Sequence, residues 1–272
     1  FWVSITDGAR WTAPDQKRAC AYYLDAAGEL DGPQVRLITE AVAEQRVVTY
    51  RGMVERRAEP GRGSTYATLV AIDPERGIVS AHRKLQPTYE ERLVWASGDG
   101  NGLRVHRFAG REGETARVGG LNCWENWVPQ ARLAMYAGGE DIHVSAWPGS
   151  VRNTVDMTRF AALEGRVFSL AAGTILSRSD IPADFPLVSS LPDGDYTDGG
   201  SAIAAPDGTW LQEPLAAEER LVIADADLAR VREERQNFDP TGHYSRPDVF
   251  ELSVDRRRLS VADLGDEPVS LD

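Results

Sequence analysis

The chain has 272 residues, of which 30 are Lys or Arg and 42 are Asp or Glu, so its formal net charge is −12. Apolar residues make up 42% and charged residues 26%, the composition of a folded globular protein with a sizeable core. Nucleic acids and anionic membranes are bound by basic surfaces, so this charge argues against both as partners.

Two helices and three strands are predicted in the first part of the chain. A short helix is expected over 15–27, and a Gly-Pro start with apolar residues at helical spacing predicts another over 32–46. Segments rich in β-forming residues predict strands over 47–55, 65–73 and 78–84. Because short turns join these strands, we expect an antiparallel meander.

The rest of the chain alternates strands with helices. The predicted strands are 103–108, 116–122, 141–147, 165–173 and 220–227, the predicted helices are 128–140, 151–164 and 226–238, and a hairpin with an Asp-Gly turn is predicted over 199–211. The sequence shows no internal repeat and no linker. We therefore expect one α/β domain with one or two mixed sheets.

Cysteine and histidine are sparse. The two cysteines suggest reduced thiols in a cytoplasmic protein rather than a stapled secreted fold. The four histidines are scattered without metal-ligand spacing, so no metal site is expected. The sequence has no apolar run of the ~18 residues that a membrane span needs, and its start does not resemble a secretory signal.

Cys123 lies in the stretch "VGGLNCWENWVP", between a predicted strand and a predicted helix. Backbone N–H groups at such an elbow face whatever the sulfur attacks, and the positive end of the helix favours a thiolate. A buried, purely structural cysteine fits the same pattern equally well. Cys20, on a helical face, is expected to be structural, and no histidine is a convincing base for Cys123.

Lys84 lies in "HRKLQPTYEERLVW", directly after a predicted strand. In a closed pocket, a lysine with a lowered pKa donates a proton or holds an oxyanion. The pattern alone favours a plainer interpretation, in which Lys84 is solvated and Glu90, Glu91 and Arg92 form a charged surface run.

These two stretches together resemble the nitrilase branch of the carbon–nitrogen hydrolase superfamily. "RFAALEGRVFSL" (159–170), "DGGSAIAAPDGTWL" (198–211) and "DPTGHYSRPDVFEL" (239–252) agree with it in order and spacing. The resemblance runs to about residue 254, which predicts a hydrolase domain over 1–254 and an acidic C-terminal extension over 255–272.

The resemblance implies an α/β fold, a four-layer α-β-β-α sandwich with two mixed sheets, and a reaction without metal or cofactor. It assigns Cys123 as the nucleophile, Lys84 as the group that stabilises developing charge, and Glu91 as its supporting carboxylate. For substrate binding it points to the backbone N–H of Trp124 and to two pocket residues, Trp147 and Pro148. Core packing explains Trp147 equally well.

The implied activity is hydrolysis of a small organic nitrile to a carboxylic acid and ammonia. An amidase, or a member that stops at the amide, is the alternative within the superfamily. Outside it, the alternative is a non-catalytic oligomeric homologue. The resemblance also implies a homo-oligomer built from dimers, which in this branch form spirals.

One part of the family pattern is absent. The family carries its general-base glutamate in a Phe-Pro-Glu motif on an early strand, and the printed sequence has neither that motif nor an initiator Met. We expect that a segment of the native gene product, with its opening strands, precedes Phe1. The alternative is a chain that has lost its base. Glu55, which ends a different predicted strand, is not expected to replace it.

Overall fold

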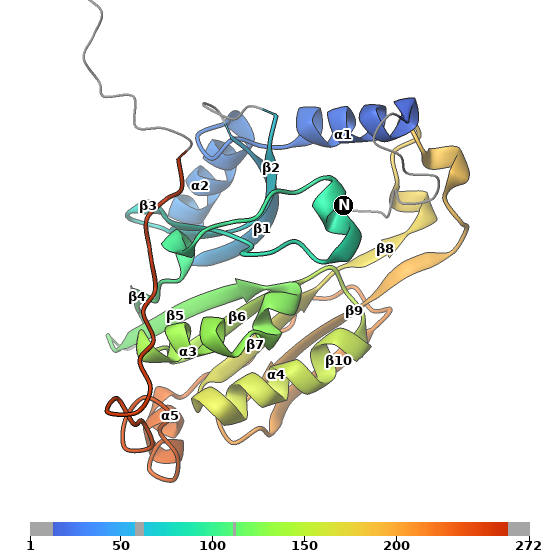
Figure 1. The fold of residues 1–272 in the computed structure, drawn as a ribbon. Helices are drawn as coiled ribbons and strands as arrows, with labels where there is room; N and C mark the ends of the chain where they lie inside the picture. Colours follow the sequence, from blue (N-terminus) through green and yellow to red (C-terminus); the bar gives the residue numbers. More distant parts are fainter. Residues whose placement is uncertain (1–12, 58–62, 111–112, 261–272) are drawn as a thin grey trace, which may run out of the picture.

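The computed structural model describes residues 13–57, 63–110 and 113–260, and it contains two β-sheets with helices on their outer faces (Figure 1). The first sheet is antiparallel with the order β1-β2-β3. Its strands are β1 (Thr49–Arg56), β2 (Thr65–Asp73) and β3 (Gly77–Arg83). The predicted meander is therefore confirmed.

Helices α1 (Pro14–Ala26) and α2 (Pro33–Gln45) lie beside this first sheet. Each begins with a proline, which suits the first turn because that position needs no intrahelical N–H bond. Val42 of α2 packs with two residues of β2, Val70 and Ile72, in one apolar cluster. Both predicted helices are confirmed to within about a residue.

The second sheet is mixed, with the order β10-β9-β7-β6-β5-β4, and β8 pairs with β9. Its strands are β4 (His106–Ala109), β5 (Thr115–Asn122), β6 (Ile142–Trp147), β7 (Phe168–Gly173), β8 (Ile175–Ser177), β9 (Asp195–Ala204) and β10 (Trp210–Ala216). Strands β5, β6 and β7 are parallel. Parallel neighbours need crossover connections, and these are α3 (Pro129–Ala137) and α4 (Val151–Gly165).

The inner faces of the two sheets meet in the middle of the molecule. The Tyr50 hydroxyl on β1 donates a hydrogen bond of 2.9 Å to the carbonyl of Val118 on β5. Gly120 on β5 lies so close to Leu69 that a Cβ there would be 2.8 Å from the leucine side chain. With α1 and α2 on one outside and α3 and α4 on the other, this is the predicted α-β-β-α layering (Figure 1).

The predicted strand over 220–227 is wrong. These residues form no regular structure, and Leu221 and Ile223 are 83% and 82% exposed. Their alternating apolar residues resemble a strand, but no strand of the described chain pairs with them. The predicted helix that follows is shorter, α5 (Leu228–Glu234), and begins where the Asp227 side chain accepts a hydrogen bond from the Ala229 N–H.

Aromatic side chains are exposed on α4, which carries Phe160, and just before α3, where Trp127 lies. Trp127 and Phe160 stack on each other and are 43% and 42% exposed. The family resemblance predicts that two copies pair through the outer helices. That pairing stays a prediction.

The described part of the expected C-terminal extension packs on its own chain. The Arg258 guanidinium lies 3.0 Å from the Asp99 carboxylate and donates a hydrogen bond to the carbonyl of Ala81 at 2.7 Å. This segment passes β4 and β3 in Figure 1. Residues 261–272, and the sequence start with its Phe-Trp pair, lie outside the described residues.

Candidate active site

Cys123 occupies a tight elbow at the end of β5. It begins a 3-10 helix, η3 (Cys123–Trp127), and its φ of 53° lies in the left-handed region that non-glycine residues rarely adopt. The Asn122 side chain caps the Glu125 N–H, and the Glu125 carboxylate accepts from the Asn122 N–H. The predicted elbow is present, although the α-helix itself starts only at Pro129.

Lys84 follows β3 and points into the interior rather than into solvent. Its Nζ lies 2.6 Å from a carboxylate oxygen of Glu91 and 2.9 Å from the Thr88 hydroxyl. Lys84 is 2% exposed and Glu91 7% exposed. The interpretation of this segment as a solvated surface run is therefore wrong for Lys84 and Glu91, whereas Arg92 is exposed and Glu90 is half-buried.

A short 3-10 helix, η1 (Tyr89–Leu93), holds Glu91 in this position. Its first turn carries a capping box, in which the Thr88 side chain and the Glu91 carboxylate each accept a hydrogen bond from the other residue's backbone N–H. The carboxylate thus has one fixed backbone donor, at 2.6 Å, in addition to Lys84. This arrangement explains why the glutamate lies seven residues after the lysine.

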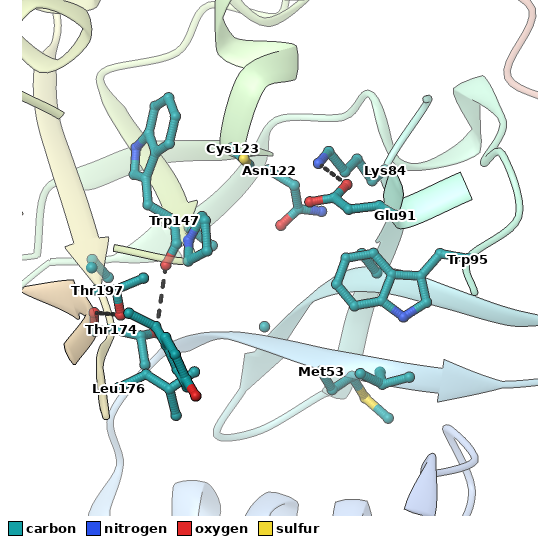
Figure 2. A pocket seen from close by; sticks show the side chains of 18 of the residues that line it. Met53, Lys84, Glu91, Trp95, Asn122, Cys123, Trp147, Thr174, Leu176 and Thr197 are labelled. Atoms are coloured by element: carbon teal, nitrogen blue, oxygen red, sulfur yellow. Dashed lines mark hydrogen bonds and ion pairs between the residues drawn. The ribbon is translucent and has the colours of Figure 1, made fainter. Parts of the chain in front are cut away.

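One cavity of about 790 Å³ brings Cys123, Lys84 and Glu91 together between the two sheets. Figure 2 shows Cys123 with the Lys84–Glu91 pair on one side of it and Trp147 on the other. Trp147, the last residue of β6, and Pro148, which follows it, line the same cavity. Four residues singled out from the sequence beside Cys123 are thus gathered around its thiol.

Trp147 and Trp124 contribute in different ways. Trp147 is 4% exposed and packs in the same apolar cluster as Cys123, so it is both a core and a cavity residue. The Trp124 side chain is 52% exposed and does not line the cavity. Its backbone N–H hydrogen-bonds to the Cys123 sulfur and lowers the pKa of the thiol. Only the backbone of Trp124 therefore contacts the Cys123 thiol, and its role toward a substrate stays a prediction.

Burial controls the charge of the nucleophile candidate. Loss of hydration raises the pKa of the Cys123 thiol to about 11, although the Lys84 ammonium acts in the opposite direction. The expected stabilisation of a thiolate by the start of the helix is outweighed in this structure. A neutral thiol must lose its proton before it attacks, so a base is required.

Among the described cavity-lining residues, the one carboxylate is Glu91, and it is paired with Lys84. Glu55 does not line the cavity. It is 2% exposed and accepts hydrogen bonds from Arg83 and from the Thr68 hydroxyl. As expected from the sequence, Glu55 is engaged elsewhere.

The raised pKa predicts a steep pH dependence of alkylation. Below pH 11 the thiolate fraction of Cys123 should rise about tenfold per pH unit, so its rate of reaction with iodoacetamide should rise by the same factor between pH 7 and pH 10. Mass spectrometry of the Cys123 peptide measures this rate separately from that of Cys20. The urea-unfolded chain is the reference. A folded-state rate that levels off below pH 9 would contradict the raised pKa.

Glu125 joins the two segments that carry Cys123 and Lys84, a role for which the sequence analysis gave no signal. It is fully buried. Its carboxylate lies 2.7 Å from the imidazole Nε2 of His82 and accepts a 2.9 Å hydrogen bond from the Leu85 N–H. These bonds, with His82 the strongest favourable contributor, hold the pKa of Glu125 below its usual value against the opposing effect of burial. The carboxylate thereby fixes the lysine segment relative to the cysteine elbow.

A Glu125→Gln substitution should therefore be costly. The amide has one acceptor oxygen where the carboxylate has two, so at least one buried N–H loses its partner. We expect a loss of about 3 kcal/mol in the free energy of unfolding, measured in urea. The same change at exposed Glu213 is the control and should cost less than about 0.5 kcal/mol. Equal effects of the two variants would show that the contacts of Glu125 with His82 and Leu85 do not contribute to stability.

A second buried network supports the backbone of Cys123. The Asn126 amide donates a 2.7 Å hydrogen bond to the Cys123 carbonyl, and its oxygen lies 2.8 Å from Nε2 of His143. The other ring nitrogen of His143 lies 2.9 Å from the Glu140 carboxylate. All of these side chains are buried. The network helps to hold the left-handed conformation of the elbow.

Comparison with known proteins identifies the family of the chain. Residues 12–236 match the family model described as carbon-nitrogen hydrolase. The chain belongs to the carbon–nitrogen hydrolase family.

Its relatives narrow this class to the nitrilase branch. The chain is 38% identical to "Nitrilase blr3397" of Bradyrhizobium diazoefficiens, over 90% of this chain and 74% of that protein. It is 34% identical to an arylacetonitrilase of Trametes versicolor, over 89% of this chain and 77% of the relative. These likenesses support hydrolysis of carbon–nitrogen bonds, and of nitriles in general.

Solved structures share the fold. A carbon-nitrogen hydrolase from Helicobacter pylori G27 superimposes with a TM-score of 0.65 at 19% identity, over 84% of this chain and 78% of the other. Saccharomyces cerevisiae Nit3, a member of branch 10 of the nitrilase superfamily, superimposes with a TM-score of 0.61 at 13% identity, over 84% of this chain and 78% of that one. The two-sheet architecture is that of the family.

The remaining kinds of feature are metal ligands and membrane-spanning helices. Within residues 13–57, 63–110 and 113–260, no three His, Cys, Asp or Glu side chains gather as metal ligands would. In that same part of the chain, no helix is both long enough and apolar enough to cross a bilayer.

Proposed function

We propose that this protein is a nitrilase that converts an organic nitrile and two waters into a carboxylic acid and ammonia, with Cys123 as the nucleophile. One observation carries the proposal. The thiol at a strained elbow shares a cavity with a buried Lys–Glu pair. The names of the relatives support nitriles as the substrates.

In the first step the Cys123 sulfur bonds to the nitrile carbon, and the carbon–nitrogen triple bond becomes the double bond of a thioimidate. Negative charge develops on the nitrogen during the attack, and the proton that the thiol gives to the base is matched by a proton that the nitrogen gains as the neutral thioimidate forms. The Lys84 ammonium and the Trp124 N–H are the donors available to stabilise the developing charge. Glu91 positions Lys84, since its carboxylate holds the ammonium at 2.6 Å.

In the second step water adds to the thioimidate carbon, and the tetrahedral intermediate expels ammonia to leave a thioester. A second water hydrolyses the thioester, which releases the acid and restores the thiol. The water additions need a base. The resemblance assigns it to the glutamate of the Phe-Pro-Glu motif, and Glu91 lies where it helps to place the attacking water.

Ammonia release from a panel of nitriles and the corresponding amides tests the proposal. We expect release from nitriles, with the carboxylic acid as the main product by chromatography. Release from amides alone would identify an amidase. Accumulation of amide from nitriles would identify a nitrile-hydrating member. No release from either set would contradict catalysis and favour the oligomeric homologue.

A further inference from the structure

Beyond the reacting groups, the wall of the cavity is mostly apolar. One side is formed by Met53 of β1 and Trp95, and the other by Trp147 and Leu176 of β8, as Figure 2 shows. The remaining apolar residues that line it are Val54, Ala67, Ala146, Pro148, Ala172, Leu187, Leu191 and Pro192. Large indole and aliphatic side chains thus face the space where the rest of the substrate must lie.

The described lining of the cavity offers no unpaired charge to a substituent of the substrate. Among its described lining residues, only Lys84 and Glu91 are charged, and these two pair with each other at 2.6 Å. The uncharged polar residues that line it are Thr68, Asn122, Thr174, Ser190, Tyr196 and Thr197. An ionised substituent on the substrate would lose its hydration without gaining a counter-ion, which is costly in an apolar site.

The volume of the cavity exceeds what a small aliphatic nitrile fills. About 790 Å³ is within the range of sites that enclose drug-sized molecules. Each methylene group that a substrate buries in such a wall improves binding about fourfold. A two- or three-carbon nitrile would leave most of the wall in contact with water.

We propose that the substrate is an uncharged nitrile with an apolar group about the size of a phenyl ring. This inference rests on the proposed nitrilase function and specifies its substrate class. The nitrile carbon lies at Cys123, and the ring lies between the Met53–Trp95 wall and the Trp147–Leu176 wall. Aromatic rings gain from both walls, because indole faces and aliphatic side chains pack well against a flat apolar surface.

Three nitriles test the substrate class on the intact protein: phenylacetonitrile, propionitrile and 4-(cyanomethyl)benzoate. We expect kcat/KM for phenylacetonitrile to exceed that for propionitrile by about 10²-fold. The benzoate, which adds one negative charge to the same ring, should be at least about 10²-fold poorer than phenylacetonitrile. Equal or faster turnover of propionitrile or of the benzoate would overturn the substrate class and leave the nitrilase function intact. No ammonia from any of the three would contradict the nitrilase function itself.

A matched pair of variants separates the cavity from the intrinsic reactivity of the nitriles. Ala172 on β7 is exposed and lines the cavity, whereas Ala109 on β4 is exposed and does not. Ala172→Phe should fill part of the ring site and lower the ratio of kcat/KM for phenylacetonitrile to that for propionitrile at least about tenfold. Ala109→Phe should leave that ratio unchanged. An unchanged ratio in Ala172→Phe would show that the ring binds elsewhere.

Discussion

Replacing Cys123 by alanine is expected to abolish ammonia release, with a loss of at least about 10⁴-fold in kcat for the best nitrile of the panel. The reason is chemical, since no other described side chain that lines the cavity is a thiol. Folding should be affected little. Alanine tolerates the φ of 53° no worse than cysteine, and the lost sulfur adjoins an open cavity. We expect about 1 kcal/mol or less in the free energy of unfolding.

Cys20 supplies the matched control. It is the second free cysteine, it lies on α1, and its sulfur contacts the carbonyl of Leu93 at 3.4 Å outside the cavity. Cys20→Ala should keep full ammonia release. If Cys123→Ala retained activity, or if both variants lost it equally, Cys123 would not be the nucleophile and the residual rate would have to come from another group.

The first sheet and its helices were predictable because their signals are local. Proline starts, helical spacing and short turns specify α2 and the meander without distant contacts. The strand predicted over 220–227 failed for the opposite reason. A strand needs the open edge of another strand, and the alternation of Leu221 with Ile223 says nothing about whether one is near. Met53, Trp95 and Leu176 of the cavity wall were not predicted for a similar reason, because they come together only in the folded molecule.

The candidate catalytic residues show which features of a site the sequence predicts and which it does not. Glu91 lies in a polar run that looks like surface, and without the family resemblance it would be assigned there. The local signal that places it inside is the Thr88–Glu91 capping box, since residues three apart lie on one side of a 3-10 turn. Asn122 and Glu125 repeat that spacing at the cysteine elbow. The contacts from Glu125 to His82 and to the Leu85 N–H join distant segments, and no local pattern predicts them.

Replacing Lys84 by methionine should damage both activity and stability. Loss of the ammonium removes a donor from the developing negative charge, which should lower kcat about 10³-fold. It also leaves the buried Glu91 carboxylate without its cation, which should cost about 3 kcal/mol in the free energy of unfolding. Ammonia release and urea unfolding measure the two effects on the same preparation. If the loss of activity merely followed from the loss of stability, Lys84 would have no chemical role. The two losses must therefore be shown to have separate causes.

The double variant Lys84→Met/Glu91→Gln separates these causes. Without either charge, the interior no longer holds an unpaired ion, so at least half of the lost stability should return. Activity should not return, because the ammonium that faces the substrate nitrogen is still absent. Recovery of activity together with stability would mean that Lys84 and Glu91 serve only to hold η1 in place. Recovery of stability alone would mean that the pair has a chemical role, which is to hold an ammonium beside the thiol. A purely structural role would not require that ammonium.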